Sequence, residues 1–73
     1  MNDMTEEPAL LSERQLALLQ AIAHGATVAE VASARGMSER QVRRILRQVW
    51  QALGVEGRNQ GLVRAGRWGL VDA

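Results

Sequence analysis

Apolar residues recur at helical spacing in four segments of this chain, and short polar or glycine-containing stretches separate the segments. The strongest pattern lies in residues 39–53, where the apolar positions share one helical face. These positions are Val42, Ile45, Leu46, Val49 and Leu53. No segment alternates with the period of a β-strand. The pattern therefore predicts an all-α fold, with helices at about 13–24, 28–35, 39–53 and 58–70.

Three of these helices have a clear start signal, a capping box in which a hydroxyl residue is followed three positions later by Gln or Glu. The boxes are Ser12–Gln15, Thr27–Glu30 and Ser38–Gln41. Each of the three helices is followed by a glycine suited to the left-handed residue that ends many helices: Gly25, Gly36 and Gly54. Because only Gly36 and Met37 separate the second helix from the cap of the third, the spacing is typical of a helix-turn-helix.

The apolar stripes also predict which side chains the helices bury. They are Leu16, Leu19, Ile22 and Ala23 in the first helix, Val31 and Ala32 with Val28 or Ala29 in the second, and Leu62, Val63, Ala65 and Trp68 in the fourth. We expect Trp50 to pack against the first or the fourth helix. The fourth helix is the least clearly marked, because Gly57 occupies its cap position and Gly61 and Gly66 lie within it, each interior glycine costing about 1 kcal/mol relative to alanine.

Length and charge indicate one small domain with an acidic extension. Residues 1–13 hold four acidic residues and no basic one, whereas residues 14–73 hold all nine arginines and the other four acids. We expect residues 1–10 to be a disordered acidic tail or linker stub and residues 11–73 to be the folded domain. The sequence shows no cysteine, signal peptide or run of about 20 apolar residues, which favours a cytoplasmic location.

The third predicted helix is one-sided in charge. Opposite its apolar stripe it carries Arg40, Arg43, Arg44 and Arg47, and Glu39 is the only acid in residues 31–55. A merely solvated helix usually interleaves both signs of charge. The second helix of a helix-turn-helix enters the major groove of DNA, where arginine makes two-pronged contacts with guanine. This pattern predicts binding to double-stranded DNA.

The chain also resembles the LuxR-type (GerE-type) helix-turn-helix domain over about residues 11–71. The similar segments are Leu11–Gln15, Ile22–Ala32, Met37–Arg43 and Leu53–Val55, followed by Arg58, Ala65 and Gly69–Leu70. The resemblance implies a four-helix bundle in which the third helix reads the major groove and the fourth makes the dimer contact. It also implies a transcriptional regulator whose N-terminal part is a receiver or sensor.

By position, the resemblance places three arginines of the third helix at base edges and the cap residues near phosphates. The residues expected to contact DNA are Thr27, Ser38, Arg40, Gln41, Arg43, Arg44 and Arg47. The expected dimer contact consists of Leu62, Ala65 and Trp68. Because this apolar surface is small, we expect a monomer in free solution and a homodimer on DNA.

Three positions that are often basic in the family are apolar here, namely Ala29, Ile45 and Ala52. Fewer basic positions mean fewer phosphate contacts. This leaves open a protein-interaction module that pairs with another regulator through the fourth helix. A sigma-factor region-4-like module that reads promoter DNA is a second alternative, because it shares the first three helices.

The sequence offers no catalytic pattern, because it lacks a nucleophile–base pair and a phosphate-binding loop. His24, the single histidine, has no cysteine or second histidine to share a metal. We therefore expect no enzyme activity, cofactor, metal or membrane contact.

Overall fold

The computed structural model describes residues 11–71, which form four α-helices and no strand. The helices are α1 (Glu13–Ala23), α2 (Val28–Arg35), α3 (Glu39–Leu53) and α4 (Arg58–Arg67). The all-α fold is confirmed, and α2 and α3 have the predicted bounds, whereas α1 and α4 end slightly earlier than predicted. The predicted acidic tail, residues 1–10, lies outside the described residues.

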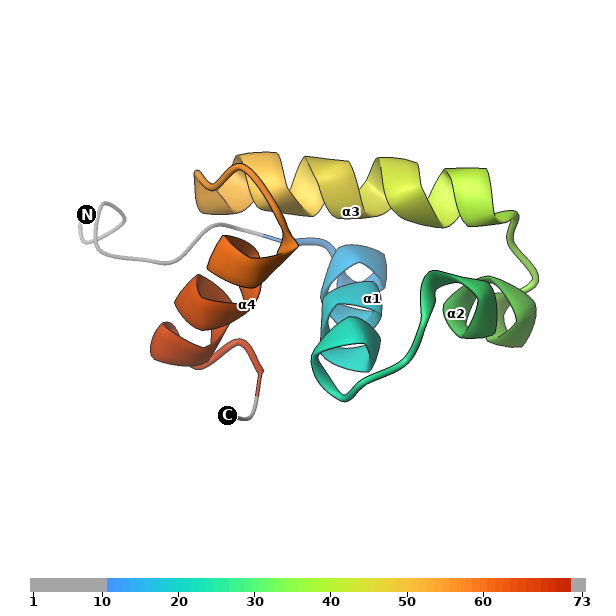
Figure 1. Ribbon diagram of the computed structural model, residues 1–73, viewed down its shortest axis with the longest axis horizontal. Helices are drawn as coiled ribbons and strands as arrows, with labels where there is room; N and C mark the ends of the chain where they lie inside the picture. The colour runs from blue at the N-terminus through green and yellow to red at the C-terminus, as the bar shows by residue number, and fades with distance from the viewer. Residues whose placement is uncertain (1–10, 72–73) are drawn as a thin grey trace.

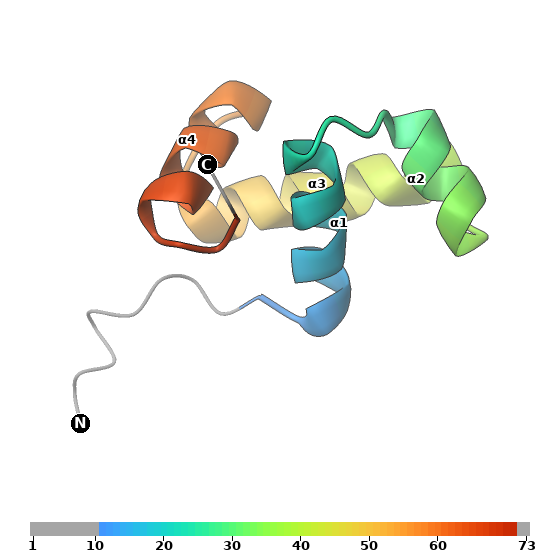
Figure 2. The same cartoon turned by 90° about the horizontal axis from the view of Figure 1, so that it is seen from below.

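The longest helix, α3, lies across the other three (Figure 1). α2 packs under its N-terminal end, α1 under its middle and α4 under its C-terminal end, and the view from below shows the same order (Figure 2). α1 also contacts α2. The side of α3 that faces away from these helices is covered by no other described element.

All three predicted capping boxes are formed. At α3, the Gln41 backbone N–H donates to Ser38 Oγ at 3.0 Å, and the Ser38 N–H donates to Gln41 Oε1 at 3.0 Å. α1 and α2 begin in the same way, with Ser12 and Thr27 as the caps. Each box satisfies backbone donors that have no partner within the helix, so the helix starts are determined locally.

α4 begins differently, because its N-cap residue, Gly57, has no side chain to accept a hydrogen bond. Gln60, the third residue of α4, instead accepts at its Oε1 from the backbone N–H of Glu56 at 3.3 Å. Because Glu56 precedes the N-cap residue, this bond is displaced by one residue from that of a capping box.

The early end of α4 has a clear cause at Gly69, which has a φ of +77°. The Leu70 N–H donates to the Ala65 carbonyl at 2.8 Å and the Gly69 N–H to the Gly66 carbonyl at 3.1 Å. This pair of bonds is a Schellman motif, and the same arrangement ends α1, α2 and α3 at their predicted glycines. All four helices therefore stop by one backbone device.

The core consists of two clusters of buried side chains that meet along α3. One contains Leu18, Ile22, Val31, Ala32, Val42 and Leu46, from α1, α2 and α3. The other contains Leu19, Val49, Leu53 and Ala65, from α1, α3 and α4. Trp50 and Leu62 pack against both clusters and join them.

Several of the predicted burial assignments were wrong. Leu18 was not expected in the core but is fully buried, because α1 lies between the two clusters and directs Leu18 into one and Leu19 into the other. Val63 was expected in the core but is 64% exposed. It lies two residues from both Gly61 and Ala65, which face the core, and therefore on the opposite side of α4. Leu16 and Ala23 are only partly buried.

Gly61 lets α3 and α4 approach each other closely. It is buried, and a Cβ added there would come within 2.4 Å of the Trp50 ring. Trp50 thus packs against α4, one of the two partners that the sequence indicates. The glycine lowers the intrinsic stability of the helix but makes room for the indole.

Replacing either of two glycines of α4 by alanine should have opposite effects on the stability of the domain. Gly61→Ala should destabilise the domain by about 1–3 kcal/mol, because the methyl group overpacks against Trp50. Gly66→Ala should stabilise it by up to about 1 kcal/mol, because its Cβ would enter open space and alanine favours a helix. Urea unfolding of both variants measures the difference, and equal effects would contradict the close contact.

Candidate nucleic-acid interface

The arginines of α3 form one exposed surface on the outside of the bundle. Val42, Leu46 and Val49 turn inward to the core, and the intervening polar side chains are exposed. A hollow of about 580 Å³ on this side is lined by Arg40, Gln41, Arg43, Arg44 and Arg47. We call these five residues the arginine face. The structure thus brings together five of the seven residues that the sequence indicates for DNA contact.

The remaining two, Thr27 and Ser38, cap the first turns of α2 and α3. Both residues are exposed, and each hydroxyl accepts a hydrogen bond from the third backbone N–H of its helix. The first two N–H groups of each helix have no intrahelical acceptor, and the helix dipole makes this end partially positive. Such an end attracts anions such as phosphate.

An acid in the first turn of α3 lies next to this basic surface and pairs with one of its arginines. Arg43 Nη2 lies 3.1 Å from Glu39 Oε1, one helical turn back, and it is the one ion pair formed within residues 11–71. The side chains of Arg43 and Glu39 remain 59% and 49% exposed. Both groups therefore stay accessible to another molecule.

The residues expected at a dimer contact do not form one surface. Ala65 is fully buried against α1 and α3, so its side chain is not available to a second molecule. Leu62 is half-buried between the two core clusters, and Trp68 is 38% exposed. The expectation that Ala65 is exposed is therefore wrong: α4 uses Ala65 for packing within the domain and exposes Val63.

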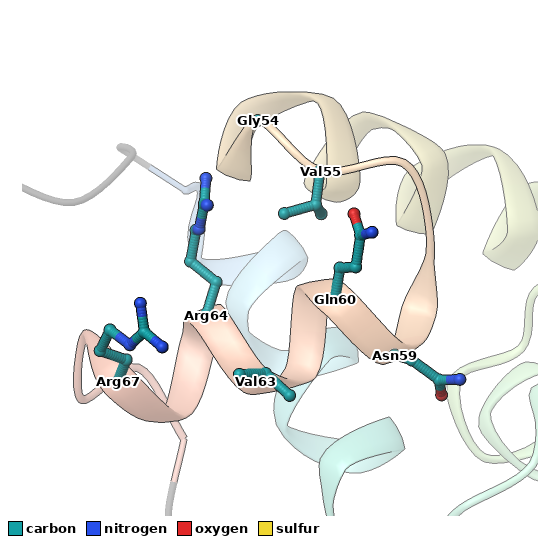
Figure 3. Close-up of a pocket in the computed structure, with 7 residues that line it drawn as sticks. All are labelled: Gly54, Val55, Asn59, Gln60, Val63, Arg64 and Arg67. Carbon is teal, nitrogen blue, oxygen red and sulfur yellow. The ribbon is translucent and has the colours of Figure 1, made fainter.

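A second hollow, of about 450 Å³, lies between α4 and the α3–α4 turn (Figure 3). It is lined by Gly54, Val55, Asn59, Gln60, Val63, Arg64 and Arg67. In Figure 3, Arg64 points toward the end of α3, whereas Asn59 points away from it. This hollow belongs to the surface of α4 rather than to the arginine face.

Arg64 has a structural role that sequence reasoning missed. Its Nη1 donates to the Leu53 carbonyl at 2.9 Å, and its guanidinium lies 5.7 Å from the centre of the Trp68 ring. The carbonyl belongs to the last turn of α3, where a cation also complements the helix dipole. The only available sequence signal was a basic residue eleven positions after the end of α3, which does not by itself indicate a contact.

Within residues 11–71, no three His, Asp or Glu side chains gather in a way that could hold a metal ion. None of the helices over the same residues has the length and apolar content needed to cross a membrane.

The arrangement of α2 and α3 defines the class of this protein. Three residues separate α2 from α3, which packs against α2 and presents a basic outer face. These features define a helix-turn-helix domain of the DNA-binding kind.

The chain belongs to the homeodomain-like domain family, whose model matches residues 8–58. This match covers α1, α2 and α3 and reaches the first residue of α4.

The fold is also similar to the crystal structure of the response regulator ChrA of a heme-sensing two-component system, with 26% identity and a TM-score of 0.78. The similarity covers 96% of this chain but 35% of ChrA, so the chain spans about a third of that regulator. No curated protein matches the chain.

The repeated Ser-Glu-Arg-Gln motif allows a matched test of the α3 cap. Ser38→Ala and Ser12→Ala should each destabilise the domain by about 1 kcal/mol, because each removes one side-chain cap. If the first turn of α3 meets phosphate, only Ser38→Ala should also weaken duplex binding. Thermal melts and duplex titrations measure the two effects. A Ser38→Ala melt that overlays the wild type would contradict the capping role.

Proposed function

We propose that this chain binds double-stranded DNA sequence-specifically, as the DNA-binding part of a transcriptional regulator, with α3 in the major groove. The observation that supports this most strongly is the arginine face, which lies on the second helix of the helix-turn-helix and is left uncovered by the bundle. A helix of this diameter fits the major groove, where arginine can make paired hydrogen bonds with guanine.

Each residue then has a distinct role in the proposal. Arg43, Arg44 and Arg47 face base edges and supply the sequence preference. Arg40, Thr27 and Ser38 contact the phosphate backbone and fix the position of the domain on the duplex. Gln41 uses its Oε1 in the cap of α3, so its NH₂ group is the part available to DNA.

Within the homeodomain-like family, we assign the chain to the LuxR type. The fourth helix supports this assignment, since it packs on the core and is followed by a Gly69–Leu70 turn like the Gly-Leu of the resemblance. The similarity to a response regulator over nearly the whole chain is also consistent with it. In this proposal residues 11–73 form the DNA-binding domain, residues 1–10 are an acidic linker or tail, and a sensor or regulator protein is the partner that supplies the signal.

Two copies are proposed to bind DNA together through the exposed side of α4. Val63 is the most exposed large apolar side chain of the described residues, and Trp68 is partly exposed. Because two side chains supply little apolar area, this contact should be weak in free solution and form only when two copies occupy adjacent half-sites. Pairing with a different regulator through the same surface is the alternative outcome.

Replacing arginines of α3 should separate base reading from phosphate contact. Arg44→Ala and Arg47→Ala should each cost about 1–3 kcal/mol on a preferred duplex and relax the base preference. Arg40→Ala should weaken binding to all duplexes more evenly and reduce the salt dependence. Titrations of a preferred and a scrambled duplex at several salt concentrations measure both effects.

The matched control is Arg14→Ala, which changes the equivalent arginine of the α1 motif. It should leave the ratio of the two affinities unchanged. Equal losses on the preferred and scrambled duplexes for Arg44→Ala and Arg47→Ala would show that these side chains do not read bases.

The proposed coupling of dimerisation to DNA predicts a monomer in sedimentation at micromolar concentration. On DNA, footprinting should show two protected half-sites in inverted orientation, about one helical turn apart. Val63→Asp should abolish protection of the second half-site while leaving binding to one half-site intact. A stable dimer without DNA, or an unchanged footprint of Val63→Asp, would contradict the coupling.

A further inference from the structure

An acid next to the arginine face, Glu39, is bonded to one of the arginines proposed to read bases. Glu39 lies in the first turn of α3, and its carboxylate accepts a hydrogen bond from Arg43 Nη2 at 3.1 Å. Among the described residues, the other arginines of the face form no ion pair. Arg43 is therefore held differently from Arg40, Arg44 and Arg47.

The Glu39–Arg43 ion pair contributes little to the stability of α3. Exposed ion pairs of this spacing contribute little to stability, and both side chains are about half exposed. The same Ser-Glu-Arg-Gln motif starts α1, where Glu13 has Ala17 rather than a cation four residues later. Its capping box forms nevertheless. The α3 cap thus does not require the ion pair.

The pair limits where the Arg43 guanidinium can go. One Nη2 bond to Glu39 leaves the other N–H donors available, and it keeps the group beside the first turn of α3. The N-terminal residues of a recognition helix are the ones that contact base edges. A free arginine, in contrast, can bind phosphates of any sequence, and the neighbouring carboxylate repels them.

We propose that Glu39 is a specificity-determining residue, which positions Arg43 for base contact and keeps it from phosphate. This inference rests on the proposed function. It predicts that the acid lowers affinity for arbitrary DNA while it raises the preference for the correct site.

The test compares Glu39→Gln with Glu13→Gln, which removes the same charge from the first turn of α1. A preferred duplex is first selected by the wild-type chain from a library of randomised duplexes. The dissociation constants of that duplex and of a scrambled duplex are then measured for each variant. For Glu39→Gln we expect two- to fivefold tighter binding of the scrambled duplex, the range that one exposed ion pair supports. The preference for the selected duplex should fall at least as much, whereas Glu13→Gln should keep the wild-type preference.

A second pair of variants tests whether Glu39 acts through Arg43. In an Arg43→Ala background, Glu39→Gln should no longer change the preference for the selected duplex, because the group that it positions is absent. An equal loss of preference with and without Arg43 would show that the charge of Glu39 acts alone, and would overturn the proposal.

The remaining outcomes separate this inference from the proposed function. If the wild type selects a duplex but Glu39→Gln keeps the wild-type preference, the positioning role is wrong and the proposed function stands. If the wild type binds no duplex, both are wrong.

Discussion

The rest of the structure depends on the single apolar stripe of α3. Val42, Leu46, Val49 and Leu53 are all buried, and they contribute to both core clusters. Burial of each such side chain contributes about 1.5–3 kcal/mol, and a domain of this size has few of them. α1, α2 and α4 are therefore held in place largely through one face of one helix. Any rotation of α3 would expose part of both clusters at once.

This constraint also explains why the opposite face is suited to recognition. Because one side of α3 is buried in the core, its arginines lie on the outside of the bundle. The other helices contact α3 along its whole length, so the arginines lie on a fixed helix. The two ends of α3 are restrained as well. Ser38 caps its start, and the Gly54 turn and the Arg64 guanidinium satisfy carbonyls at its end. Side chains carried by such a rigid helix are positioned more precisely than side chains carried by a loop.

The composition of α4 is a compromise between helix propensity and close packing against α3. Gly61 disfavours the helix but admits the Trp50 ring, and Ala65 completes the second core cluster. The opposite side of α4 exposes Val63 beside arginines. The fully buried positions of α4 are thus its small residues Gly61 and Ala65, beside the half-buried Leu62. Its stability comes from tertiary contact rather than from intrinsic propensity.

The sequence by itself determined where α1, α2 and α3 begin and, to within one residue, where they end, because capping boxes and stop glycines act within a few residues of one another. It also determined that the arginines of α3 share a face, since helical periodicity is local; their contact with DNA stays a prediction. Only the tertiary structure decided that Leu18 is buried and Val63 exposed, because this depends on how many neighbours each helix has. It also decided that Ala65 is buried, that Gly61 accommodates Trp50 and that Arg64 reaches Leu53. These last facts join residues on different helices, and their relative placement is set by the packing of the whole core.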